Sequence, residues 1–321
     1  MKTVRADENS TRGVVYRDAS VETLPRRGLF LLILLSFLWG SAWPFVKIAL
    51  NEIGPWSFRT FCVGFSGIFI LAFAKRRGNK LLFSKKELGP LLLVSLLNVT
   101  GWNMLSAYGV SYMHAGRAVI IGFTMPVWAS VLGVLILRER LDLRRLMGLS
   151  FGIAGLAVLF GPDLRALGSH PMGPVLMLGS AFCWAAGTVF VKYFRWTTRM
   201  TVLAGWQFVL GGIPVVIGAL TVEPVAGLQG LSFEGALAAA FVAMLCMPLG
   251  WWAWFEVVTL LPAGVAALGT IAVPVIGVFS SALVLREPLG FQEIFALFCV
   301  AAALAIVLVG PETFKPRIGS R

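Results

Sequence analysis

The sequence predicts an all-α integral membrane protein with ten transmembrane helices arranged as two inverted five-helix repeats. Composition is the first observation: hydrophobic residues make up 58% of the 321 residues and charged residues only 13%. A soluble domain carries about 25% charged residues and cannot bury this much apolar surface. An internal repeat, which divides the apolar part of the chain into halves, is the second observation. The lipid bilayer is therefore the expected partner of most of the surface.

Helices account for the apolar residues better than strands do. A transmembrane helix needs roughly 17–25 apolar residues, and no run shows the two-residue alternation of a membrane β-barrel. The ten expected spans cover residues 28–48, 56–74, 88–110, 115–137, 144–160, 173–193, 202–221, 234–255, 263–285 and 291–309.

The repeat is clearest in the fourth and ninth spans. The stretches TMPVWASVLGVLILRERL and AVPVIGVFSSALVLREPL each place a glutamate thirteen residues after a proline. Trp39 and Lys47 in the first span likewise match Trp184 and Lys192 in the sixth. Because each half holds an odd number of spans, the second half enters the membrane from the opposite side. The expected divisions are a cytoplasmic polar tail at 1–27, one repeat at 28–161, the inverted repeat at 173–310 and a cytoplasmic basic tail at 311–321.

Basic residues are distributed unevenly about these spans. Most of the 27 lie in the two tails, in the loop 75–87, and after the fourth and sixth spans. When ten spans are threaded, these segments fall on one side, which the positive-inside rule makes cytoplasmic. The sequence therefore predicts a multi-pass protein of the inner (cell) membrane with both termini in the cytoplasm. The net charge of +12 is explained in this way and indicates no nucleic-acid partner.

The two P-x(12)-E-x-L segments, the Ala-Gly helix starts at Ala115 and Ala263, and the ten-span plan resemble the drug/metabolite transporter (DMT) superfamily, specifically its EamA-type members. The resemblance covers about 28–311. It implies a secondary membrane transporter that exports or exchanges small metabolites, amino-acid-like or otherwise amphipathic, by alternating access through a central cavity between the repeats. Efflux of lipophilic or cationic drugs by the same fold, and a solute channel, are the alternatives.

Matched tryptophans are the first candidates for the substrate cavity. In inverted repeats the site lies near the membrane midplane, between the halves. Trp39 and Trp184 lie near the centres of the first and sixth spans, where an indole offers a flat apolar face and one N–H donor. Ser41, Trp43 and Thr188 are their neighbours. Packing or contact with lipid is the alternative role of these tryptophans.

The third span provides a second candidate face. Ser95, Asn98, Trp102 and Ser106 have the spacing of residues on one side of a helix. An asparagine in hydrocarbon is costly unless it faces protein or water, so this face lines the cavity or forms hydrogen bonds between helices. Trp251 in the eighth span is a further candidate for the cavity or a gate, with the aromatic belt at the membrane surface as the alternative.

Two prolines are candidates for gating. Pro126 and Pro274 occupy equivalent places in the fourth and ninth spans. Each leaves a backbone carbonyl one turn upstream without its helical donor, which favours a kink. A kink of this kind bends during gating or serves static packing.

Carboxylates are expected only toward the ends of the spans. Glu256, toward the cytoplasmic end of the eighth span, is the nearest to mid-membrane. Because proton- and sodium-driven carriers usually place such a group within the bundle, a uniporter or exchanger is favoured. Glu139 and Glu287 are expected to pair with the adjacent Arg138 and Arg286.

Basic side chains near the outer ends of spans have two interpretations. Lys47, Arg59 and Arg117 either extend to the membrane surface or receive an anionic group from the outer mouth, and the first is favoured.

The sequence does not predict an enzyme, a metal site or a cofactor. The two histidines, His114 and His170, lie at or beyond the outer surface, and the four cysteines are scattered singly with no metal-ligand spacing. A homo-oligomer is neither required nor excluded.

Overall fold

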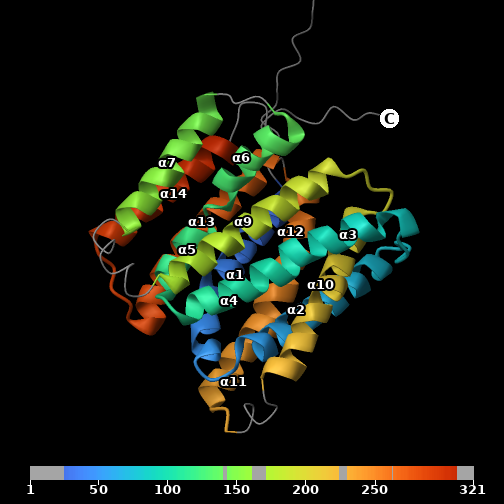
Figure 1. The fold of residues 1–321 in the computed structure, drawn as a ribbon, viewed down its shortest axis with the longest axis horizontal. Coiled ribbons are helices and arrows are strands. Elements are labelled where there is room, and N and C mark those ends of the chain that lie inside the picture. The colour runs from blue at the N-terminus through green and yellow to red at the C-terminus, as the bar shows by residue number, and fades with distance from the viewer. Residues whose placement is uncertain (1–24, 140–142, 161–170, 224–229, 262, 309–321) are drawn as a thin grey trace, which may run out of the picture.

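The computed structural model describes residues 25–139, 143–160, 171–223, 230–261 and 263–308, and over these ranges the regular elements are all helices (Figure 1). The two predicted tails, except for residues 25–27, and the expected outer loop around residues 161–170 lie outside the described residues. The expected all-helical class is confirmed for the described ranges.

Seven helical segments are long and apolar enough to cross a membrane. They are Arg26–Leu50, Pro55–Arg76, Lys85–Ser111, Ala115–Leu137, Met172–Tyr193, Met200–Val222 and Phe233–Leu260. Three shorter apolar helical segments, Leu146–Leu159, Thr270–Leu285 and Phe291–Ile306, complete the set. In the labels of Figure 1 the uninterrupted helices are α1 (Arg26–Leu50), α2 (Pro55–Arg76), α7 (Leu143–Phe160), α9 (Met172–Tyr193), α10 (Met200–Val222), α13 (Ala263–Leu285) and α14 (Phe291–Leu308).

Two segments contain a π-helical turn at the same distance from their start. In the first half, α3 (Leu88–Ser95) continues through a π turn (Leu96–Gly101) into α4 (Trp102–Ser111). In the second half, α11 (Phe233–Ala240) continues through a π turn (Phe241–Cys246) into α12 (Met247–Leu260). Such turns widen the helix, change which side later residues face, and are frequent at functional sites.

The two candidate kink prolines differ in structure. The fourth segment is interrupted at Phe123–Thr124, between α5 (Ala115–Gly122) and α6 (Met125–Leu137), and Pro126 lies in the first turn of α6. A proline is well tolerated there because the first N–H groups of a helix have no intrahelical acceptor. The break lies within one turn upstream of Pro126, where a proline leaves a carbonyl without its helical donor, so the chain is interrupted there between two helices; a role of this interruption in gating stays a prediction. Pro274 does lie inside a continuous helix, α13.

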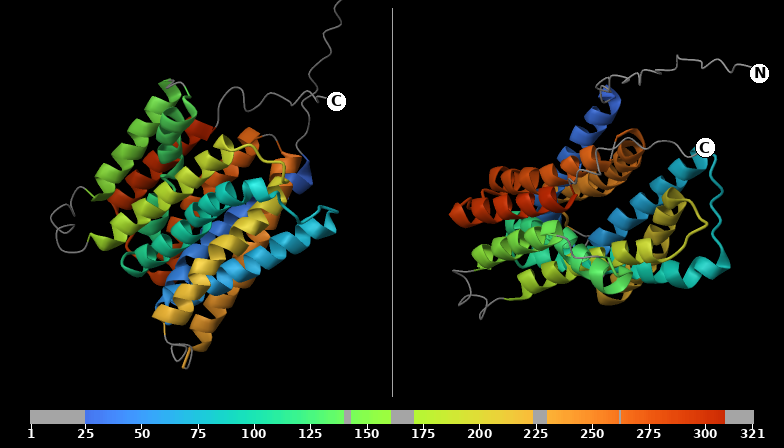
Figure 2. Two further views of the ribbon diagram at one scale, coloured as in Figure 1. Left: turned by 45° about the vertical axis from the view of Figure 1, so that its right-hand side comes forward. Right: turned by 90° about the horizontal axis from the view of Figure 1, so that it is seen from above.

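Helices of one half pack mainly against helices of the other. The closest pairs are α2 with α10, α7 with α14, and α1 with α13 (Figure 1). Two further views show the first two pairs lying side by side from each direction (Figure 2). The largest buried hydrophobic cluster contains residues of α1, α5, α11 and α13, so the core lies between the halves. This arrangement brings the central tryptophans of both halves together.

Candidate functional site

Five tryptophans form a continuous group in the middle of the molecule, which we term the tryptophan cluster: Trp39, Trp102, Trp184, Trp251 and Trp254. Ring centroids lie 5.1 Å apart for Trp102 and Trp184, 6.2 Å for Trp184 and Trp251, and 5.5 Å for Trp39 and Trp251. Trp254 lies 6.3 Å from Trp39. Helices α1 and α4 of the first half and α9 and α12 of the second thus each contribute at least one ring.

Glycines make this close approach feasible. A Cβ atom at Gly250 would lie 2.1 Å from Nε1 of Trp39, so the indole packs directly on the backbone of α12. A Cβ atom at Gly122 would lie 3.4 Å from Cη2 of Trp43 and 3.5 Å from Cη2 of Trp102. Trp43 therefore reaches the edge of the cluster at the end of α5. Gly250 is not among the residues that the sequence predicts for the site.

Several polar atoms of the predicted cavity residues are buried without a hydrogen-bond partner among the described residues. They include Nε1 of Trp39, Oγ of Ser41 and Oδ1 of Asn98. Burial of an unpaired donor or acceptor costs about 1–3 kcal/mol of folding free energy, so most buried polar atoms in proteins have a partner. Three of the residues predicted for the cavity thus carry free hydrogen-bonding capacity.

The expected polar face of the third span is divided by the π turn. Ser95 Oγ donates to the Leu91 carbonyl, whereas Asn98, within the turn, donates Nδ2 to Oε1 of Gln207 at 3.0 Å. Trp102 contacts the tilted ring of Trp184 on α9, and Ser106 accepts a hydrogen bond from Arg59 of α2.

The Asn98 side chain fits against the second half because Gly187 of α9 has no side chain. A Cβ atom at Gly187 would lie 1.9 Å from Oδ1 of Asn98. Gln207 of α10 is the partner that sequence reasoning missed, since a single glutamine in an apolar span carries no positional signal.

Thr188, Trp196 and Trp206 lie outside the tryptophan cluster. Thr188, one turn after Trp184, is exposed. Trp196 and Trp206, near the ends of helices, donate their indole N–H groups to backbone carbonyls of Val191 and Leu81.

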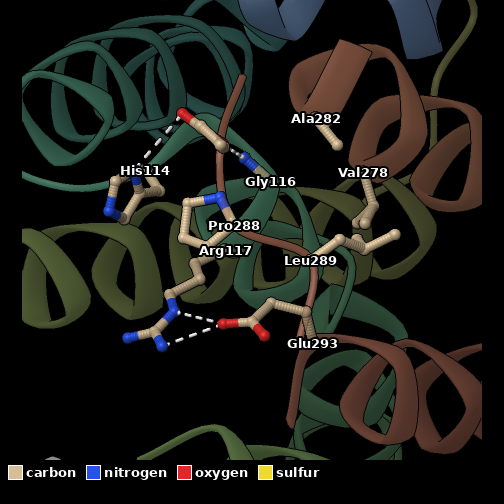
Figure 3. Close-up of a pocket in the computed structure, with 9 residues that line it drawn as sticks. His114, Gly116, Arg117, Val278, Ala282, Pro288, Leu289 and Glu293 are labelled. Carbon is tan, nitrogen blue, oxygen red and sulfur yellow. Dashed lines mark hydrogen bonds and ion pairs between the residues drawn. The ribbon is translucent and has the colours of Figure 1, made fainter. Parts of the chain in front are cut away.

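A small pocket lies at the end of the bundle where α5 begins (Figure 3). It is lined by His114, Gly116, Arg117, Val278, Ala282, Glu287, Pro288, Leu289 and Glu293, and it encloses about 10 Å³. That volume suffices for roughly one water molecule. A polar cavity of about 360 Å³ lies at the opposite end, lined by residues 78–84 and 197–199. Neither is lined by a residue of the tryptophan cluster.

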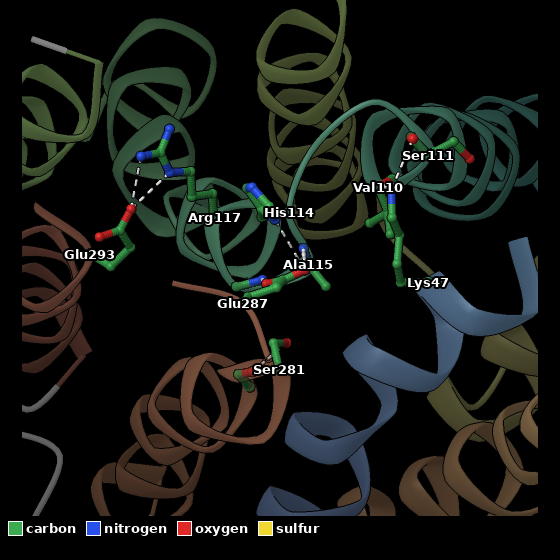
Figure 4. A network of polar contacts seen from close by, with 11 residues as sticks. Lys47, Val110, Ser111, His114, Ala115, Arg117, Ser281, Glu287 and Glu293 are labelled. Atoms are coloured by element: carbon green, nitrogen blue, oxygen red, sulfur yellow. Dashed lines mark hydrogen bonds and ion pairs between the residues drawn. The ribbon is translucent and has the colours of Figure 1, made fainter. Parts of the chain in front are cut away.

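Glu287 makes a cross-bundle contact in place of the expected local ion pair (Figure 4). Its carboxylate accepts hydrogen bonds from the backbone N–H groups of Ala115 at 2.7 Å and Gly116 at 2.8 Å, which begin α5. The preceding Arg286 has φ = 54°, a left-handed conformation that turns the chain at the end of α13. A carboxylate at a helix N-terminus satisfies free N–H groups and complements the helix dipole.

The repeat mates at the opposite end show a related but different arrangement. Arg138 has φ = 56°, as Arg286 has φ = 54°, and the following Glu139 forms an ion pair with Lys192 of α9. The matched lysine, Lys47, instead donates Nζ to the carbonyls of Val110 at 2.8 Å and Ser111 at 2.9 Å (Figure 4). Glu139 and Glu287 thus each contact the other half of the chain, and the expected pairing with the neighbouring arginine did not include these contacts.

Other carboxylates also join the halves. Glu223, after α10, accepts hydrogen bonds from the N–H groups of Trp56 and Ser57 at the start of α2. Glu52, after α1, accepts hydrogen bonds from the hydroxyl and N–H groups of Ser232 before α11, and these bonds lower the pKa of Glu52 below its ordinary value.

Ion pairs connect the halves at both ends of the bundle. Glu256 is buried in α12 and pairs with Arg27 at the start of α1 and Arg77 at the end of α2. Arg117 pairs with Glu293 at 2.9 Å.

Arg59 differs from the other basic residues. It is 4% exposed and therefore does not extend to the surface, so the favoured sequence interpretation is wrong for this residue.

Comparison with known proteins assigns the family. The model of the EamA-like transporter family matches this chain twice, over residues 26–161 and 171–309. The "Uncharacterized transporter YvbV" of Bacillus subtilis (strain 168) is 30% identical over 292 residues, which cover 89% of this chain and 93% of that protein. The "Probable amino-acid metabolite efflux pump" of Escherichia coli (strain K12) is 26% identical over 308 residues, which cover 92% of this chain and 100% of that protein.

A chain of known crystal structure has the same fold, with a TM-score of 0.60 at 16% identity over 86% of this chain and 95% of that one. The resemblance to EamA-type members of the DMT superfamily is thereby confirmed: this chain belongs to the EamA-like transporter family, whose members are multi-pass membrane transporters.

Proposed function

We propose that this protein is a secondary transporter of the inner membrane that exports or exchanges small amphipathic metabolites, amino-acid-like solutes among them, by alternating access. The tryptophan cluster is the observation that carries the proposal. Two of its rings, Trp39 and Trp102, come from the first half, and three, Trp184, Trp251 and Trp254, come from the second. Aromatic faces beside unpaired polar atoms suit a solute with an apolar body and a polar end.

Two inverted repeats of five spans each are the architecture that we propose for this mechanism. The family model matches each half separately, over 26–161 and 171–309. Each half contains an eight-residue α-helix followed by a six-residue π turn, and each contains a left-handed arginine before a glutamate. If the three shorter apolar segments of the described residues also cross the membrane with the seven long ones, each half has five spans and the second repeat enters the membrane from the opposite side, as the proposal requires.

The matched lysine–glutamate residues support two gates that alternate. At one end Lys192 and Glu139 form an ion pair, while at the other Lys47 and Glu287 contact backbone groups. Alternating access requires equivalent contacts at the two mouths to differ within any one conformation.

The printed names of two relatives favour metabolites over drugs. Proteins of Salmonella typhimurium and Escherichia coli are each named "Probable amino-acid metabolite efflux pump". A channel is disfavoured because the central residues come from two unlike halves, whereas channels usually present rings of like residues. An enzyme is disfavoured because the family is one of transporters.

Counterflow in liposomes tests the proposal. Purified protein in liposomes preloaded with an unlabelled solute is expected to accumulate the same labelled solute for at least one member of a panel of amino acids, nucleosides and cationic drugs. Protein-free liposomes and heat-inactivated protein are the controls. Rapid dissipation of every solute gradient, without transient accumulation, would indicate a channel, and an inert protein would refute transport.

Glu256→Gln is expected to leave counterflow unchanged. The carboxylate bonds to Arg27 and Arg77, which are 67% and 55% exposed, so its environment is that of a structural ion pair at the membrane surface. Because Glu256 itself is buried while both arginines are mostly exposed, we expect removal of its charge to lower thermal stability measurably without unfolding the protein. Preserved counterflow with loss of pH-gradient-driven transport would instead identify Glu256 as a proton site.

Reporter fusions test the orientation. Inserted after Lys80, a reporter that functions only in the cytoplasm is expected to be active. Inserted after Ser111, a reporter that functions only outside the cell membrane is expected to be active. The positive-inside rule gives this result because Lys75, Arg76 and Arg77 precede the first insertion point. The reverse pattern of activities would refute the predicted orientation, with the N-terminus in the cytoplasm.

A further inference from the structure

Arg59 is a buried cation without an anionic partner among the described residues. Its side chain lies in α2, one turn after the helix start, and is 4% exposed. Nη2 donates to the hydroxyl of Ser106 at 3.2 Å, the Cys62 thiol lies beside the guanidinium, and the Phe58 ring lies 5.3 Å from its central carbon. These neighbours are uncharged, and Nε has no hydrogen-bond partner. An arginine keeps its charge in proteins, so the guanidinium of Arg59 still lacks a hydrogen-bond acceptor for its Nε–H group. An anionic acceptor would bind it best.

Three other basic residues of the bundle have hydrogen-bond or ion-pair partners within the protein. Arg117 has Glu293, Arg77 has Glu256, and Lys47 has two backbone carbonyls. Burying a charge without a counter-ion is strongly unfavourable, and a charged residue within a membrane bundle usually marks a ligand path. A purely structural role would be served better by an apolar residue at position 59.

Arg59 lies within one helical turn of the tryptophan cluster by two routes. Its partner Ser106 is four residues after Trp102 on α4, and such residues are neighbours on a helix surface. On α2 itself, Val63 follows Arg59 by four residues and belongs to the hydrophobic cluster against which Trp251 packs. One helical turn rises about 5.4 Å, so a small solute can reach both the guanidinium and the rings.

We infer that Arg59 binds the carboxylate of the transported solute, whose apolar part contacts the tryptophan cluster. This inference rests on the proposed transport function and narrows the substrate class to organic carboxylates, amino acids included. Ser106 orients the guanidinium, which offers a planar pair of N–H donors matched to a carboxylate. Cationic drugs are disfavoured as substrates, because a buried positive charge beside the site repels them.

Matched acid and amide probes test the inference. L-phenylalanine with L-phenylalaninamide, and indole-3-acetate with indole-3-acetamide, differ in the carboxylate alone. We expect at least one acid to raise the midpoint of thermal unfolding of the purified protein and to exchange in liposomes, and its amide to do neither. In Arg59→Gln the apparent affinity for that acid should fall at least about tenfold, and Arg59→Lys should restore part of it.

A stability measurement separates this role from a structural one. Without solute, Arg59→Leu should unfold at least about 2 °C higher than the wild type, because a buried uncompensated charge has been removed. Arg117→Gln is the matched control: it leaves Glu293 without this partner, so it should unfold at a lower temperature and keep the affinity for the acid. If the glutamine variant at Arg59 does not fold, Ser106→Ala should still weaken acid binding several-fold.

Three results would overturn the inference: acid affinity unchanged in a folded Arg59→Gln protein, amides exchanged as well as acids, or no response of the wild type to either acid. Exchange of other solutes would continue in the second and third cases, so transport itself would stand. A wild-type protein that moves no solute of the wider panel would refute the proposed function first.

Discussion

Trp39→Ala and Trp184→Ala proteins are expected to bind solute at least roughly tenfold more weakly than the wild type. Both rings contact Trp251, and Trp184 also contacts Trp102, so each substitution opens the tryptophan cluster. Aromatic contacts contribute about 0.5–1.5 kcal/mol beyond the burial of apolar area, and about 1.4 kcal/mol is a tenfold change in affinity. Counterflow measured over a range of solute concentrations reports the change.

Trp196→Ala is the control for this prediction. Trp196 contacts Phe194 and donates to the Val191 carbonyl near the end of α9, outside the cluster. Its removal should leave apparent affinity within about twofold of the wild type, as expected for a surface position. Wild-type affinity in correctly inserted Trp39→Ala and Trp184→Ala proteins would place the site elsewhere, and the surroundings of Asn98 would then be tested.

Gly250→Ala is expected to abolish most transport and to lower the free energy of unfolding by about 1–3 kcal/mol. The new methyl group would lie 2.1 Å from Nε1 and 2.6 Å from Cδ1 of Trp39. Trp39 cannot move aside freely because Trp251 and Trp254 pack against it. Displacement of the ring therefore disturbs the whole cluster, which thermal unfolding and counterflow both detect.

Gly64→Ala is the matched control, since it adds the same methyl group within a helix. A Cβ atom at Gly64 would meet no atom within 4 Å, so no clash arises. Alanine is favoured over glycine inside a helix by up to about 1 kcal/mol, and this variant should be at least as stable as the wild type. Equal behaviour of the two variants would show that the contact between Gly250 and Trp39 is unimportant.

Apolar composition and the repeated segments were sufficient to predict the helical class, most span limits and the family. Trp39 and Trp184 were matched because they occupy equivalent positions in the repeats, and the structure joins them through Trp251. Trp102 and Trp251 were candidates for the cavity, but their contacts with Trp184 were not predicted. Helix crossing angles, which sequence spacing does not contain, bring them together.

The remaining differences have local causes. A π turn gives no distinct pattern in an apolar run, so the face containing Asn98 and Ser106 was expected to be continuous. The left-handed conformation of Arg286 directs Glu287 to another helix, and arginine is not a residue that predicts such a turn. Burial of Arg59 depends on the packing of α2 against α4, which hydropathy alone cannot predict.

The carboxylates that cap helices of the opposite half have consequences for the evolution and the assembly of such a protein. Glu223 and Glu287 of the second half complete α2 and α5 of the first, and Glu52 of the first half bonds to Ser232 before α11 of the second. Neither half is therefore self-sufficient: a single repeat made alone would leave helix ends open until a second copy inserted the other way up. Gene duplication and fusion would guarantee that each first half has one second half to pair with. If the two halves are expressed as separate chains, they should be purified as a complex when both are present, and each should be degraded when it is expressed alone.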